Sequence, residues 1–78
     1  MGKTIRVGVV GLGMGRAHIE GYRRHPGCEV VAIADVDAKR LAECGDKYGI
    51  AQRYADAAAM FREAELDAVS IAVPNKFH

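Results

Sequence analysis

The feature that most constrains the fold of this chain is a short apolar strand that runs directly into a cluster of glycines. Ile5–Val10 reads Ile-Arg-Val-Gly-Val-Val, and the glycines that follow are Gly11, Gly13 and Gly15. The β-branched run predicts a buried strand, followed by a tight turn and a helix from about Gly15 to His25. Backbone N–H groups at a helix start can approach a phosphate closely where no Cβ intervenes. The stretch therefore predicts a phosphate-binding loop.

The rest of the chain alternates strands and helices. Apolar runs predict strands at Glu29–Ala34 and Ala68–Val73, and Ala51–Tyr54 is expected to form only a short strand at an edge of the sheet. Between them, Asp37 and Asp56 are the predicted N-caps of helices over Ala38–Tyr48 and Ala57–Glu63, and Gly49 is expected to end the first of these helices. This β-α-β-α-β-α-β order predicts an α/β, partial Rossmann fold with a parallel sheet in the strand order 3-2-1-4. The glycine loop would then lie at the switch point of the sheet, where ligands bind.

Composition narrows the classes of function. The 78 residues are 50% hydrophobic and 27% charged, which is typical of one small globular unit. Their net charge is +1 and they contain no long run of basic residues, so nothing suggests a nucleic-acid partner, and no apolar run is long enough for a membrane span. Cys28 and Cys44 share no metal-ligand spacing. We therefore expect no metal site and two reduced thiols, as in a cytoplasmic protein.

A carboxylate at the end of the second predicted strand makes a dinucleotide site the more specific interpretation of the glycine loop. Asp35 follows Gly11 by 24 positions, close to the spacing at which an acidic residue binds the ribose of a dinucleotide. Its charge would repel a 2′-phosphate, which favours NAD over NADP as the cofactor. The spacing G-x-G-x-G also suits an S-adenosylmethionine loop. Such loops usually carry an acidic residue two positions before the first glycine, where this chain has Val9.

Four other polar residues are interpreted as structural or solvated. Lys39 and Arg40 could meet a 2′-phosphate, but solvated positions at a helix start are the preferred interpretation. His18 is expected to pack or to bond to the backbone. Ser70 lies in the middle of a predicted strand with no base expected nearby.

Three motifs together resemble the Gfo/Idh/MocA family of NAD(P)-dependent sugar and inositol dehydrogenases. They are Gly11-Leu12-Gly13-Met14-Gly15-Arg16-Ala17-His18, Ile33-Ala34-Asp35-Val36-Asp37 and Ala72-Val73-Pro74-Asn75-Lys76-Phe77-His78. The resemblance covers the whole chain, with a glycine loop one residue shorter than G-x-G-x-x-G. It implies that Gly11, Gly13 and Gly15 line the pyrophosphate, that Leu12 and Met14 supply loop backbone, and that Asp35 binds the ribose. Pro74, Asn75 and His78 would lie beside the nicotinamide.

The resemblance also implies what these 78 residues do not contain. Members of the family carry a Glu-Lys-Pro segment, whose lysine assists proton transfer, and a second domain with a catalytic histidine. We therefore expect residues 1–78 to be the N-terminal portion of a dinucleotide-binding domain, without a substrate domain and without activity alone. An alternative of another class is a self-assembling half-Rossmann unit. In that case an exposed sheet edge or exposed helix faces would join two copies in a homo-oligomer.

Overall fold

Strands and helices alternate along the chain in the predicted order. The computed structural model describes residues 4–72. Its elements are β1 (Ile5–Val10), α1 (Leu12–Arg23), β2 (Cys28–Ala34), α2 (Ala38–Tyr48), β3 (Gln52–Tyr54), α3 (Ala57–Glu63) and β4 (Ala68–Ile71). None of the helices between residues 4 and 72 has the length and apolar character that crossing a bilayer requires.

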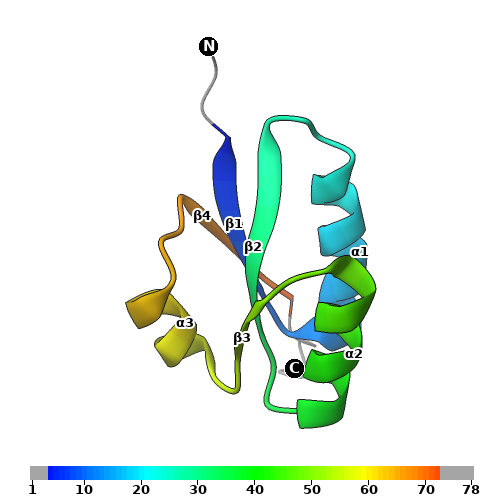
Figure 1. The fold of residues 1–78 in the computed structure, drawn as a ribbon, viewed down its shortest axis with the longest axis vertical. Coiled ribbons are helices and arrows are strands. Elements are labelled where there is room, and N and C mark those ends of the chain that lie inside the picture. The colour runs from blue at the N-terminus through cyan, green and yellow to red at the C-terminus, as the bar shows by residue number, and fades with distance from the viewer. Residues whose placement is uncertain (1–3, 73–78) are drawn as a thin grey trace, which may run out of the picture.

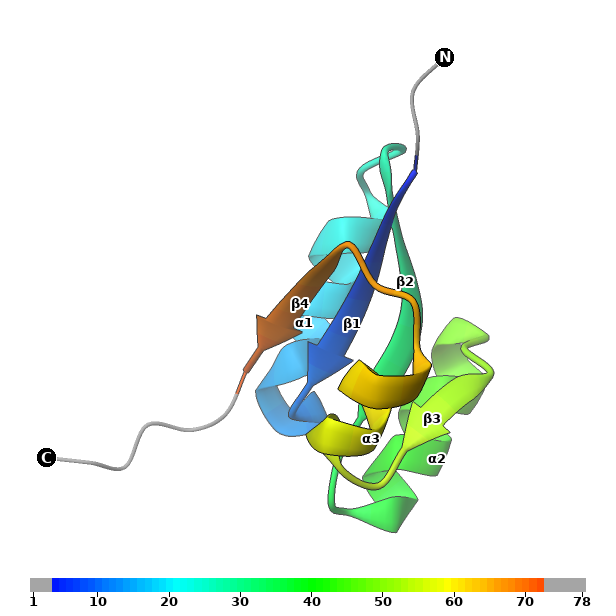
Figure 2. The ribbon, with the colours of Figure 1, turned by 90° about the vertical axis from the view of Figure 1, so that its left-hand side faces the viewer.

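The four strands form one parallel sheet in the order β3-β2-β1-β4, which confirms the predicted topology. Figure 1 shows α1 and α2 on one face of this sheet and α3 on the other, and the turned view in Figure 2 agrees. All strands point the same way, so their carboxyl ends meet along one edge. The loop after β1 leaves this edge next to the ends of β2 and β4.

Each face of the sheet has its own hydrophobic core. The core under α1 and α2 contains Val7, Val9, Leu12, Ile19, Ile33, Cys44 and Ile50. The smaller core under α3 contains Ala32, Ala34, Met60 and Ala64. Alternate residues of a strand face opposite sides of the sheet, and this places Ile33 in the first core and its neighbours Ala32 and Ala34 in the second. The two-sided burial explains why the strands read as nearly continuous apolar runs.

The helix caps follow the predicted chemistry. The carboxylate of Asp37 accepts a hydrogen bond from the backbone nitrogen of Arg40 at 3.0 Å, and that of Asp56 accepts one from Ala59 at 2.8 Å. Gly49 ends α2 in the left-handed conformation with φ 67°. All three positions confirm the boundaries expected from sequence.

Several element boundaries differ from expectation. Helix α1 begins at Leu12, three residues before the predicted start, and ends at Arg23 instead of about His25. The early start has a physical reason: Gly11 adopts φ 85°, so the chain turns out of β1 in a single residue. Strand β2 begins one residue early at Cys28, β3 begins one residue late at Gln52, and β4 ends at Ile71. The predicted end of the last strand at Val73 lies outside the described residues.

Candidate functional site

The glycine loop is held in place by backbone hydrogen bonds to both neighbours. The N–H of Gly11 donates to the carbonyl of Ala34 at 3.0 Å, which ties the loop to the end of β2. The carbonyl of Gly11 accepts from the N–H of Gly15 at 2.8 Å, which is the first hydrogen bond of α1. Gly11 itself has φ 85° and ψ 80°, a conformation that glycine adopts without strain. The start of α1 is therefore fixed relative to the sheet.

The first turn of α1 leaves two backbone amides available. The first N–H groups of a helix have no partner within the helix. Here the N–H of Leu12 donates to the Oδ2 of Asp35 at 2.8 Å. The amides of Gly13 and Met14 have no acceptor among residues 4–72. These two donors, at the positive end of the helix dipole, are suited to bind an anionic oxygen.

Asp35 is the buried polar residue at the centre of the site. It follows β2 and is 8% exposed. Its Oδ1 accepts a hydrogen bond from the N–H of Asp37 at 2.8 Å, while its Oδ2 accepts the one from Leu12. Each carboxylate oxygen can accept two hydrogen bonds, so Oδ1 retains capacity for one more, while Oδ2 also faces the Nε of Arg40 at 3.1 Å. A hydroxyl group of a ligand is suited to this remaining capacity.

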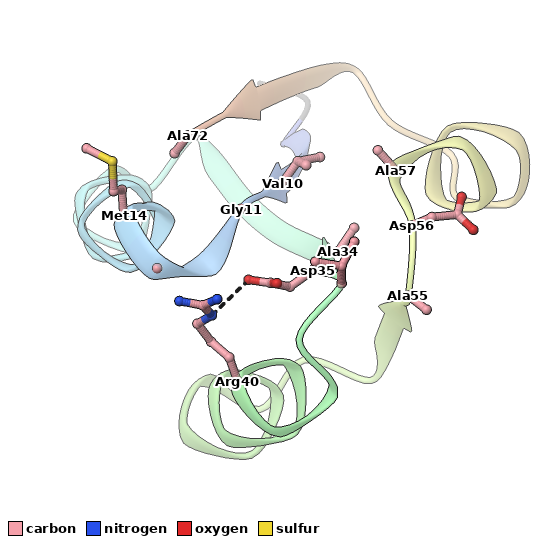
Figure 3. A pocket seen from close by; sticks show the side chains of 12 residues that line it. Val10, Gly11, Met14, Ala34, Asp35, Arg40, Ala55, Asp56, Ala57 and Ala72 are labelled. Carbon is pink, nitrogen blue, oxygen red and sulfur yellow. Dashed lines mark ion pairs between the residues drawn. The ribbon is translucent and has the colours of Figure 1, made fainter. Parts of the chain in front are cut away.

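A cavity of about 340 Å³ opens at this edge of the sheet, and Asp35 lies in its wall. Figure 3 shows the side chains around it, which come from the ends of the strands and the starts of the three helices. The lining residues are Val10, Gly11, Gly13, Met14, Ala34, Asp35, Val36, Arg40, Ala55, Asp56, Ala57 and Ala72. Most of them are small or apolar, and the charged ones are Asp35, Arg40 and Asp56. This composition is typical of a small-molecule site.

The structure brings four of the predicted site residues together, since Gly11, Gly13, Met14 and Asp35 all line this cavity. Leu12 contributes its amide to Asp35, but its side chain is fully buried in the core. Pro74, Asn75 and His78 lie outside the described residues, so their expected place beside the nicotinamide stays a prediction.

Gly15 has a packing role in the structure. It lies inside α1, its N–H is bonded to Gly11, and it does not line the cavity. A Cβ built on Gly15 would lie 2.9 Å from a Cγ of Val9. This glycine therefore lets the helix approach β1 closely.

Arg40 is the residue that the sequence interpretation placed wrongly. It was expected to be a solvated residue at a helix start, but its Nε lies 3.1 Å from the Oδ2 of Asp35 and it lines the cavity. Its side chain is 39% exposed. The backbone N–H of Arg40 also donates to Asp37, and this hydrogen bond lowers the pKa of the Asp37 carboxyl. The sequence signal was its place in the first turn of α2, which starts directly after the Asp35 loop.

A second contact also departs from expectation, and it involves β4, the outer strand next to β1. The Nδ1 of His18 lies 2.6 Å from the Oγ of Ser70, where no base was expected. This contact joins α1 to β4 through two side chains instead of through the backbone. Neither residue lines the cavity. The pair therefore connects the helix to the edge strand and takes no part in the site around Asp35.

Known proteins resemble this chain in both sequence and fold. An oxidoreductase family with an NAD-binding Rossmann fold matches residues 5–78. A D-apiose dehydrogenase from Paraburkholderia graminis is 38% identical over 77 residues, covering 97% of this chain and 20% of that protein. An inositol 2-dehydrogenase from Corynebacterium glutamicum is 40% identical over 80 residues, covering 100% of this chain and 24% of that protein.

A solved structure extends the likeness to three dimensions. The scyllo-inositol dehydrogenase from Lactobacillus casei with bound NAD(H) and scyllo-inositol superposes with a TM-score of 0.86 at 31% identity. The match covers 97% of this chain and 23% of that one. The chain thus spans about a fifth to a quarter of the length of these relatives. With the family match over nearly all its residues, the chain belongs to the Gfo/Idh/MocA oxidoreductase family, of which it carries the NAD-binding Rossmann fold.

Proposed function

We propose that this chain binds NAD(H), with the pyrophosphate against the amides of Gly13 and Met14 and the adenosine ribose at Asp35. The observation that carries the proposal is the common wall that these groups form. Two amides that have no acceptor within residues 4–72 and a carboxylate with spare acceptor capacity line one cavity of about 340 Å³. The amides suit an anionic oxygen, and the carboxylate suits a ribose hydroxyl.

The residues of this chain bind and orient the cofactor. The nicotinamide, when bound, supplies an acceptor or donor of hydride. Asp35 would fix the ribose, and the start of α1 would fix the phosphates, so that the far end of the cofactor has a defined direction. Pro74, Asn75 and His78 are proposed to flank the nicotinamide. Gly11 supports the arrangement through its left-handed backbone, which begins the helix directly after β1.

The likeness to inositol and D-apiose dehydrogenases leads us to propose a sugar or polyol as the substrate class of the whole enzyme. Residues 1–78 would form the N-terminal portion of its dinucleotide-binding domain.

NAD(H) is the proposed preferred cofactor because the buried charge of Asp35 opposes a 2′-phosphate. The compartment that we propose is the cytoplasm. Cys28 and Cys44 are both free thiols in the structure, which fits a reducing environment.

Titration of the chain with NADH, followed by nicotinamide fluorescence, tests the proposal. Binding should weaken by about tenfold or more in Asp35→Ala, since hydrogen bonds to a charged group contribute about 1.5–3 kcal/mol each. The matched control is Asp46→Ala, because Asp46 lies on the exposed side of α2 and pairs with Arg53. NADH binding equally to both variants, or S-adenosylmethionine binding more tightly than NADH, would contradict the proposal.

A second proposal concerns association between copies of the chain. Among the described residues β4 pairs on one side only, with β1, and its Val69 and Ile71 are 40% and 61% exposed. An open apolar strand edge favours pairing with another strand, so we propose a homodimer through β4. Sedimentation should show dimers that Ile71→Lys converts to monomers, with Lys39→Glu as an exposed control. A monomer of the unmodified chain at high micromolar concentration would contradict this proposal.

A further inference from the structure

Helix α1, which begins at the glycine loop, touches β4 at two places. The Nδ1 of His18 lies 2.6 Å from the Oγ of Ser70. Three residues earlier in the helix, a Cβ built on Gly15 would lie 3.7 Å from the Cβ of Ala72. Figure 2 shows β4 at the edge of the sheet with α1 behind it. Residues three apart share a helix face and residues two apart share a strand face, so both contacts belong to one interface between α1 and β4.

The hydrogen bond in this interface restrains β4 in a direction that the sheet does not. Among the described residues β4 is hydrogen-bonded to β1 only, with Ser70 opposite Val9. A strand held on one side can still tilt about its ladder, because no neighbour holds its other side. A hydrogen bond has a narrow range of distance and angle, and a serine hydroxyl can form one with either tautomer of His18. The His18–Ser70 contact therefore opposes a tilt of β4 away from α1.

The carboxyl end of β4 is part of the cavity wall. Ala72 lines the cavity, and its N–H donates to the carbonyl of Val10 at 2.8 Å. Pro74 and Asn75, which are proposed to flank the nicotinamide, follow Ala72 in the sequence. Asp35 and the start of α1 are instead tied to β1 and β2. A tilt of β4 would therefore move the part of the wall at Ala72 and leave the part at Asp35 in place.

Resting on the NAD(H) binding proposed above, we infer that His18 and Ser70 are positioning residues for the nicotinamide half of the cofactor. Neither side chain lines the cavity, so both act through β4. The adenosine half depends on Asp35 and on the amides of α1, which do not require β4. The pair therefore determines how much the nicotinamide adds to the affinity, and it leaves the affinity for the rest of the molecule unchanged.

Calorimetric titration of the chain with NADH and with ADP-ribose separates the two halves, because ADP-ribose has the same adenosine and pyrophosphate without the nicotinamide. The unmodified chain should bind NADH about tenfold or more tighter than ADP-ribose. His18→Ala and Ser70→Ala should each lower this ratio by about fivefold or more, while the affinity for ADP-ribose changes by about twofold or less. The double variant should lower the ratio no further than either single variant, since the two residues form one contact.

Two further variants complete the test. His25→Ala removes an exposed histidine just after α1 and is the matched control, so it should keep the ratio of the unmodified chain. His18→Asn guards against loss of folding in His18→Ala. The asparagine amide can present a polar atom close to the place of Nδ1, so this variant should keep the ratio within about twofold. A folded His18→Asn chain with a ratio as low as that of His18→Ala would contradict the role of the contact.

A merely structural role for the pair makes a different prediction. If His18 and Ser70 only stabilised the fold, their loss would weaken NADH and ADP-ribose to the same degree and leave the ratio unchanged. An unchanged ratio in the alanine variants would overturn the inference, as would equal affinity of the unmodified chain for the two ligands. In both cases NADH still binds and the proposed function stands, whereas binding of neither ligand would overturn both.

Discussion

The Oδ2 of Asp35 lies 2.8 Å from the backbone nitrogen of Leu12, so a side chain at the end of β2 caps the first turn of α1. The residue at the N-cap position, Gly11, has no side chain that could do this. Its left-handed backbone carries the chain from β1 into the helix in one step, and the missing cap is supplied from 23 residues along the chain. The same carboxylate is therefore a structural cap and the proposed ribose ligand.

This double role predicts that Asp35→Asn destabilises the chain. The carboxylate accepts hydrogen bonds from the amides of both Leu12 and Asp37, whereas an asparagine presents one acceptor oxygen and one NH₂ donor. One buried amide would then lose its acceptor, which costs about 1–3 kcal/mol. Urea unfolding followed by circular dichroism measures this loss. Asp46→Asn, at an exposed carboxylate, is the control, and equal stability of the two variants would contradict the cap.

Two glycines of α1 predict opposite effects of the same substitution. A Cβ on Gly15 would lie 2.9 Å from a side-chain carbon of Val9, which is itself fully buried. Gly21 has nothing within 4 Å of its built Cβ. Gly15→Ala should lose about 1–3 kcal/mol through overpacking, while Gly21→Ala should gain about 0.5–1 kcal/mol through better helix propensity. Thermal unfolding gives both values, and a Gly15→Ala chain as stable as Gly21→Ala would contradict the close approach.

The fold was predictable because its signals are local. The β-branched runs of β1 and β2, the caps Asp37 and Asp56, and the left-handed Gly49 each act on neighbouring residues. The alternation of apolar runs and capped helices then predicted the order of the elements, and the rules for parallel sheets predicted the order of the strands. The three spaced glycines predict a turn of several residues, which puts the predicted start of α1 three residues too late. In the structure one residue with positive φ makes the turn.

The composition of the site was predictable in part, and its internal contacts were not. The glycine spacing and Asp35 pointed to the right cavity because they follow adjacent strands of one sheet. The contact of Arg40 with both Asp35 and Gly13 depends instead on how α2 packs beside α1. A side chain that reaches across two elements leaves no periodic signal in the sequence. The same holds for His18 and Ser70, which are 52 positions apart.

The core under α3 predicts a strong dependence on one methionine. Met60 is fully buried and packs over Gly8 of β1, where a built Cβ would lie 2.9 Å from its Cε. Met60→Ala should cost about 2–5 kcal/mol, a large part of the stability of so small a domain. Phe61, its neighbour, is 49% exposed and serves as the control, with an expected loss for Phe61→Ala below about 1 kcal/mol. Urea midpoints that coincide for the two variants would contradict the assignment of this core.

The contact between Glu20 and Tyr48 predicts a pH dependence of stability. The Tyr48 hydroxyl donates to the Glu20 carboxylate at 2.7 Å, and this hydrogen bond lowers the pKa of Glu20 from its usual 4.5. Burial, with the same carboxylate, raises the pKa of Tyr48 above 10.0. The lowered Glu20 pKa stabilises the fold above about pH 4.5 and loses this effect as the pH falls. The raised Tyr48 pKa stabilises it below about pH 10 and loses this effect as the pH rises.

Tyr48→Phe tests the predicted loss of stabilisation at both low and high pH. The difference in unfolding free energy between the unmodified chain and Tyr48→Phe should be constant between about pH 5 and pH 9 and should shrink on both sides. Tyr54→Phe is the control, because the Tyr54 hydroxyl lies 3.4 Å from the neutral amide of Gln52. The difference in unfolding free energy between the unmodified chain and Tyr54→Phe should not follow the titration of a carboxylate. A Tyr48→Phe difference that stays flat down to about pH 3 would contradict the contact.

The two cysteines should differ sharply in reactivity. Cys44 is 2% exposed in the core under α1 and α2, and desolvation raises the pKa of its thiol, so little thiolate forms near neutral pH. Cys28 is half-buried at the start of β2 and borders a second, smaller cavity. An aromatic disulfide reagent at about pH 8 should therefore modify the native chain in a fast phase at Cys28, with Cys44 reacting on the slower time scale of opening. Cys28→Ser should abolish the fast phase, and Cys44→Ser should leave it intact.

Urea should bring both thiols of the unmodified chain into one fast phase, because unfolding removes the burial that separates them. A fast phase that survives Cys28→Ser in the native chain would show that the core around Cys44 opens far more readily than its burial predicts.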